Sequence, residues 1–170
     1  MAQVIAYQQN NGKLAVVYPT GELPFEEVAR KDVPAGVPYV IVDESDLPQD
    51  NVFFEAWEAD FSTPHGTGIG AQAWFIEKYQ AEIAAINAEI APAEPSIILP
   101  IAYEAMAFHE EATDEEKVNA YALYLDSVKA ENDKLAADHV NAVAQWEASK
   151  AQRIEALNNQ IAVQEEERAA

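Results

Sequence analysis

Residues 113–170 have the sequence TDEEKVNAYALYLDSVKAENDKLAADHVNAVAQWEASKAQRIEALNNQIAVQEEERAA, in which neither glycine nor proline occurs. The residues that favour helices, alanine, glutamate, lysine, glutamine and leucine, dominate it. Thr113 can cap a helix, Glu116 can reach back to the cap, and the acidic first turn suits the positive end of the helix dipole. The stretch therefore predicts a helix that starts here and meets no breaker before the C-terminus.

The apolar residues of this helix form a narrow and partly polar stripe. Val118, Tyr121, Leu125 and Val128 follow a spacing of three and four, but the pattern slips near His139 before it resumes. A helix with so thin a stripe is not stable alone in water and needs partners. Its own preceding helix, further copies of the chain or a client protein would serve. The sequence leaves this choice open, as it does whether the helix folds back at the slip.

Glycine and proline are confined to the preceding part of the chain. All six glycines lie at or before Gly70, and all nine prolines lie at or before Pro100. Residues 4–7 and 13–18 are β-rich runs, and Asn10-Asn11-Gly12 between them provides the positive φ that a tight hairpin turn needs. We therefore expect a β-rich N-terminal domain over residues 1–70.

The rest of this domain alternates short elements with turns. Residues 24–29 predict a helical turn, and residues 39–42 predict a strand. Residues 52–61 predict a long strand, which would place Phe53, Trp57 and Phe61 on one face and Phe54 on the other. Aromatic side chains on both faces indicate either core packing or contact with a client. We take these as the candidate client-binding residues: Phe53, Phe54, Trp57 and Phe61.

Residues 71–170 predict a helical domain for oligomerisation. It divides into a helix over 71–90, a proline-rich joint over 91–100 and a long helical region over 101–168. In the first helix, a seam of mostly isoleucine at spacings of three and four favours three or more strands in a coiled coil, although packing within the same domain explains it equally well. The candidate oligomerisation residues are Ile76, Tyr79, Ile83, Ile86 and Ile90. The expected fold class is thus α+β, with a small β-rich domain followed by a long, coiled-coil-prone helical part.

Composition limits the classes of partner. The net charge of −20 repels nucleic acid and anionic membranes, so we expect no binding to either. It fits solubility, or an acidic surface for a basic or amide-rich partner. The chain has no cysteine, which excludes disulfides and thiolate metal sites. The first residues lack the pattern of a signal peptide, so a cytosolic protein is the expectation.

Catalytic patterns are weak. Gly66–Ala71 can be aligned with the glycine-rich dinucleotide-binding turn, but the preceding strand is acidic and no second strand with a ribose-binding acid follows. A flexible turn between domain and helix is the simpler interpretation. His65, His109 and His139 are scattered, and no serine has a nucleophile-elbow frame. We expect no enzyme activity, cofactor or metal.

Four segments carry a resemblance to a known family: residues 11–19 (NGKLAVVYP), 31–39 (KDVPAGVPY), 46–50 (DLPQD) and 54–61 (FEAWEADF). Together they resemble the tail-fibre assembly proteins of tailed phages, over roughly residues 3–75. The helical remainder is similar only in its Ala/Glu/Gln-rich character.

The resemblance implies a chaperone that binds the phage tail-fibre protein in the cytoplasm of the infected host and shields it while three fibre chains fold and assemble. It implies homo-oligomerisation, with a trimer favoured, because tail fibres are generally trimers. The alternative is a structural virion component, an adaptor of the fibre or baseplate that stays in the particle. The sequence does not decide which region of the fibre is bound.

Overall fold

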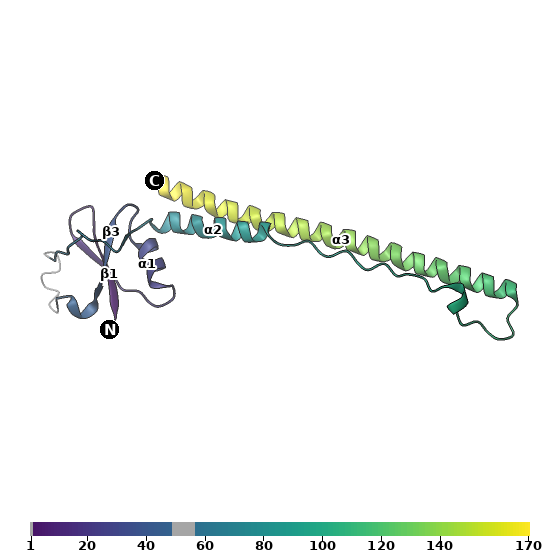
Figure 1. Cartoon of the computed structure of the whole chain (residues 1–170). Helices are drawn as coiled ribbons and strands as arrows, with labels where there is room; N and C mark the ends of the chain where they lie inside the picture. Colours follow the sequence, from purple (N-terminus) through teal and green to yellow (C-terminus); the bar gives the residue numbers. More distant parts are fainter. Residues whose placement is uncertain (1, 49–56) are drawn as a thin grey trace. The chain divides into compact units, whose positions relative to one another are not determined.

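A computed structural model describes residues 2–48 and 57–170 (Figure 1). Contacts divide the chain into two units, Met1–Ala85 together with Glu155–Ala170, and Ile86–Ile154. The first unit holds a small antiparallel sheet, and a long helix ends the chain. The expected mixture of a β-rich N-terminal domain with a long C-terminal helix is confirmed at this level.

The sheet has four antiparallel strands in the order β2-β1-β3-β4. The predicted hairpin is present, and its turn is closed by Gly12, which has φ +83° and donates its N–H to the Gln9 carbonyl at 2.9 Å. The predicted third strand is present as well, whereas β4 is a two-residue strand that sequence patterns did not indicate. The strands span β1 Gln3–Gln8, β2 Leu14–Val17, β3 Pro38–Asp43 and β4 Gly66–Thr67.

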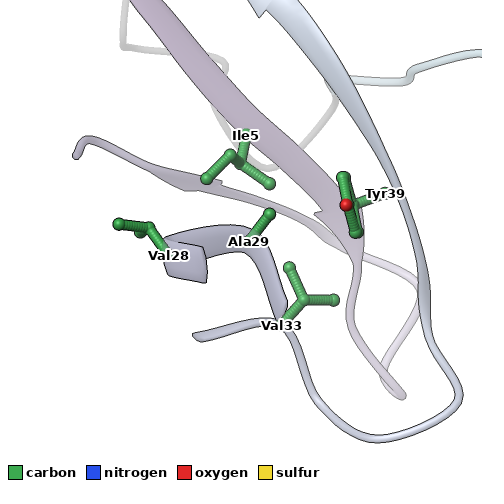
Figure 2. Packing of buried hydrophobic residues seen from close by; sticks show 5 residues of the cluster. All are labelled: Ile5, Val28, Ala29, Val33 and Tyr39. Atoms are coloured by element: carbon green, nitrogen blue, oxygen red, sulfur yellow. The ribbon is translucent and has the colours of Figure 1, made fainter. Parts of the chain in front are cut away.

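The main core lies between this sheet and α1 (Phe25–Asp32). Figure 2 shows Ile5 of β1 and Tyr39 of β3 directed toward Val28 and Ala29 of α1, with Val33 just beyond the helix. All five are buried. Because side chains alternate along a strand, β1 also supplies the opposite face of the sheet.

The opposite face carries a smaller cluster of Ala6, Leu14 and Val40, against which Trp57 and Phe61 pack. Residues 57–61 have no regular secondary structure, so the strand predicted over 52–61 is wrong in this part, and the remainder lies outside the described residues. These residues instead follow the sheet face on which Trp57 and Phe61 pack, and the Asp60 carboxylate accepts the Ser62 N–H at 2.8 Å, which turns the chain at the end of this part.

The two long helices are α2 (Ala71–Asn87) and α3 (Asp114–Ala169). The predicted start of α3 is confirmed by a capping box in which Thr113 N–H donates to Glu116 Oε2 at 2.8 Å and Glu116 N–H donates to Thr113 Oγ1 at 3.3 Å. The helix does not fold back near His139. Its 56 residues extend for about 84 Å at the standard rise.

Residues 88–113 connect the two helices and contain one 3₁₀ turn, Tyr103–Ala105. The helix predicted to reach residue 90 therefore stops three residues early, because Pro92 lacks the N–H that would bond the Ala88 carbonyl and its ring clashes with that carbonyl. The helical region predicted from residue 101 starts only at Asp114. We call the extended stretch 88–102 the strap.

Candidate protein-interaction surfaces

The glycine-rich segment before α2 is fixed to the domain rather than flexible. The N–H groups of Gly68, Ile69 and Gly70 donate to the carbonyls of Val37, Arg30 and Val33 at 2.9, 2.9 and 3.1 Å. A Cβ on Gly68 would lie 2.2 Å from the Val33 oxygen, so only glycine allows this approach. The expected flexible turn is therefore wrong, and these three donors are already used by the protein.

Side chains of α1 and α2 connect across the same junction. Glu27 accepts hydrogen bonds from Trp74 Nε1 at 2.6 Å and from Lys78 Nζ at 2.8 Å, and Arg30 pairs with Glu77 at 2.7 Å. The hydrogen bond from Lys78, followed by that from Trp74, lowers the pKa of the Glu27 carboxyl below its ordinary value. The start of α2 is thus oriented by the N-terminal domain.

Within residues 86–154, the strap lies along α3 and is held through its backbone (Figure 1). Asn132 donates its amide to the Ile98 carbonyl at 2.9 Å and accepts the Ile98 N–H at 2.8 Å. The Tyr121 hydroxyl donates to the Ile101 carbonyl at 2.9 Å, and the Ile101 N–H donates to the Tyr124 oxygen at 3.0 Å. Both backbone polar groups of Ile98 and of Ile101 are therefore satisfied by helix side chains.

Two basic residues of α3 hold the beginning of the same stretch. Lys150 Nζ donates to the Asn87 carbonyl at 3.1 Å, at the end of α2. Arg153 makes a two-pronged pair with Glu89, at 2.7 and 2.5 Å. The hydrogen bond from Arg153 is the main cause that lowers the pKa of Glu89.

The covered stripe of α3 repeats every eleven residues. Its buried or half-buried positions follow intervals of three, four and four, which explains the slip that a seven-residue pattern shows near His139. Eleven residues over three turns give 3.67 residues per turn, close to an undistorted α-helix, so the stripe stays on one side of it. The stripe comprises Tyr121, Tyr124, Val128, Asn132, Leu135, His139, Val143, Trp146, Lys150, Ile154, Leu157 and Ile161.

Large apolar side chains are exposed mainly in residues 86–154. Nine of the eleven exposed ones in the described part of the chain lie there, including Ile97 at 75% and Leu99 at 80%. Ile97 and Leu99 alternate with the clamped Ile98, so their backbone is fixed while their side chains are open to solvent. The exposed apolar side chains close together along the strap make it a candidate surface for contact with another protein.

The structure does not bring the predicted site residues that it describes together on one surface. Of the client-binding candidates, Trp57 and Phe61 are half-buried against the sheet, while Phe53 and Phe54 lie outside the described residues. Of the oligomerisation candidates, Ile86 is buried, Ile76, Tyr79 and Ile83 are half-buried, and Ile90 is 93% exposed beyond the end of α2. The surface of the strap was missed, although its apolar run SIIL between Pro95 and Pro100 was the available signal.

Other kinds of site have little support among the described residues. The His65 Nδ1 accepts the Ile41 N–H at 3.1 Å and so supports the edge of β3. Over residues 2–48 and 57–170, no three His, Asp or Glu side chains are grouped as metal ligands. None of the helices described combines the length and hydropathy needed to cross a bilayer.

Comparison with known proteins adds no relative, because no family model, curated protein or solved structure matches the chain.

Proposed function

We propose that this chain is a phage tail-fibre assembly chaperone, a protein that holds the fibre chain during folding and trimerisation. The observation that carries the proposal is the exposed apolar surface of residues 86–154 on a backbone fixed by hydrogen bonds. The identity of the client rests on the sequence resemblance over residues 3–75. A fibre chain that awaits its two partners exposes apolar faces and unpaired strands, which such a surface would cover.

The N-terminal sheet offers a second point of contact. β2 is its outer strand and has no further strand beside it among the described residues. Gln9 N–H donates to the Lys13 carbonyl, so these two residues form a hydrogen-bonded pair of the hairpin. Hydrogen-bonded pairs alternate along an antiparallel ladder, so the backbone groups of Ala15 and Val17 bond to β1, and those of Leu14 and Val16 point away from the sheet. An unfinished strand of the fibre would add to this edge.

The test is co-expression of the chain with the tail-fibre protein encoded beside it, followed by mass determination of the purified species. We expect a stable complex, with fibre that stays soluble only when the chain is present. Fibre that trimerises in soluble form without the chain would contradict the proposal. Retention of the chain in purified virions would favour instead the structural component, in which α3 docks the protein into the particle.

A further inference from the structure

We propose that a second copy of this chain packs beside α3, parallel and in register, so that an apolar side of one helix meets a small-residue side of the next. The inference concerns only residues 114–154 of α3. It is independent of the client, since a monomer could also hold a fibre chain.

The first side of the contact is an apolar flank, defined as Val118, Leu125 and Val140. Leu125 and Val140 each follow a half-buried residue of the covered stripe, Tyr124 or His139, by one position, which places the flank about 100° around the helix from the stripe. Val118 lies seven residues, about two turns, before Leu125 on the same side. The three side chains are 57%, 37% and 65% exposed. Val118 and Val140 expose more than half of their surface, and Leu125 between them exposes about a third.

The other side of the contact is a small flank, defined as Ala120, Ser127 and Ala142. Each lies two residues after a member of the apolar flank, hence about 200° around the helix and about 3 Å along it. When two copies lie parallel and in register, every large side chain of one therefore faces a small side chain of the other. Such a fit of ridges into grooves allows close helix packing.

The charges on the two sides are complementary and favour a second copy of the chain as the partner. Lys129 lies on the side of the apolar flank, and Glu131 follows it by the same two positions on the side of the small flank. In the parallel arrangement the base of one copy meets the acid of the next. Lys129 also pairs with Asp133 of its own helix at 2.6 Å, but both are well exposed and free to exchange partners.

The antiparallel alternative is disfavoured by the same residues. In an antiparallel pair, Val118 of each copy would face Val140 of the other. The midpoint of the contact would then be position 129 in both copies. Two Lys129 side chains would then face each other, and Leu125 would face Asp133. The parallel contact joins nearly opposite sides of the two copies, so it adds chains along a row rather than pairing them by a two-fold axis.

Cysteine cross-linking tests the geometry, because the native chain contains no cysteine. The variant Val140→Cys with Ala142→Cys places both thiols on opposite sides of one helix, where their Cβ vectors diverge and no bridge within a chain can form. Mild oxidation should convert most of it into covalent species of two or more chains that a reductant separates. The control Ala137→Cys with Ala148→Cys, two exposed positions on the side of the helix between the two flanks and opposite the strap, should stay single.

The single variant Val140→Cys distinguishes the orientations. It should remain uncross-linked, because position 140 of one copy faces position 142 of the next. Cross-linking of this single variant as efficiently as the double one, or no cross-linking of the double one, would overturn the proposal.

Charge reversal tests the choice of partner on the protein without cysteines. Lys129→Glu and Glu131→Lys should each weaken self-association several-fold, as followed by light scattering over a dilution series, while the combined variant should recover it. Circular dichroism checks that helix content is unchanged. A combined variant no better than either single one would overturn the pairing, and a native chain that is monomeric would overturn the whole inference while leaving client binding to be judged by co-expression.

Discussion

Asn132 shows how one side chain can hold a whole segment. Its amide makes both bonds to Ile98, and removing them leaves two backbone groups that only water can satisfy. We expect Asn132→Leu to cost about 1–2 kcal/mol of local stability, because two neutral hydrogen bonds are lost. Hydrogen exchange of the Ile98 amide should become faster. Asn141→Leu, at an exposed position of the same helix, is the matched control, and equal exchange in both variants would contradict the clamp.

Gly68 is a second single position with a large expected effect. The Cβ of Gly68→Ala would meet the Val33 carbonyl at 2.2 Å, and backbone must move to relieve the clash. We expect a loss of about 1–3 kcal/mol in the free energy of unfolding, measured with urea. Thr67→Ala, at the exposed neighbouring position, should stay within about 0.5 kcal/mol of the native protein. A Gly68→Ala variant of native stability would show that the segment has room.

Glu27 makes the junction with α2 sensitive to acid. Its pKa is lowered in the folded protein by Lys78 and Trp74, so its contribution is present above the unfolded pKa and is lost as pH falls through the lower folded pKa. The melting temperature of Glu27→Gln should therefore lie below that of the native protein at pH 7, and the difference should shrink below pH about 4. Glu26→Gln, with an exposed side chain, is the control. A difference that is constant with pH would contradict the linkage.

At the scale of elements, β2 separates inward from outward backbone groups. Ala15→Pro removes a donor of the ladder with β1 and should cost about 1–3 kcal/mol, because its partner carbonyl loses its bond, whereas Val16→Pro removes an outward donor and should cost much less. Chemical unfolding of the two variants provides the comparison. Equal losses would mean that the register of the free edge is wrong. If Val16→Pro keeps most of its stability, it is the variant with which to test strand addition by the fibre protein.

Local signals predicted most elements from the sequence. The hairpin turn at Gly12, the helix that follows Pro24 and the capping box at Thr113 each depend on neighbours within four residues, and each is present. β4 could not be predicted, because two residues are a strand only through their pairing with Pro38 and Tyr39. The path of residues 57–61 depends likewise on a sheet face built by distant residues.

The interaction surface was harder to predict than the fold. The polar residues Tyr121, Asn132 and Lys150 weaken α3 as a coiled-coil seam, and only their contacts with residues 87–101 explain them. A stripe that repeats every eleven residues is also not detected by a search for the seven-residue repeat of coiled coils. The isoleucines of α2 were recognisable as a stripe, but their number alone did not distinguish an oligomer seam from internal packing.

At the scale of the whole molecule, the charge of −20 opposes every contact between copies. Salt shortens the range of this repulsion, from about 30 Å at 0.01 M to about 8 Å at 0.15 M ionic strength. We therefore expect self-association to strengthen as salt rises over this range, measured by sedimentation at fixed concentration. Steady weakening would indicate that the attraction between Lys129 and Glu131 outweighs the repulsion, and no assembly at any salt would count against the self-contact.

The hydrogen bonds from α3 to the backbone of Ile98 and Ile101 constrain the helix residues that make them, but not the side chains of the strap. They grip main-chain atoms, which every residue possesses except for the missing N–H of proline, so the outward side chains at positions 97 and 99 can be exchanged without moving the segment. In the proposed function, α3 determines where the strap lies, and the side chains of the strap determine which partner it binds. A lineage that changes its partner would therefore need to alter only a few strap residues, and the same stretch is a natural place to engineer a new binding preference onto an unchanged frame.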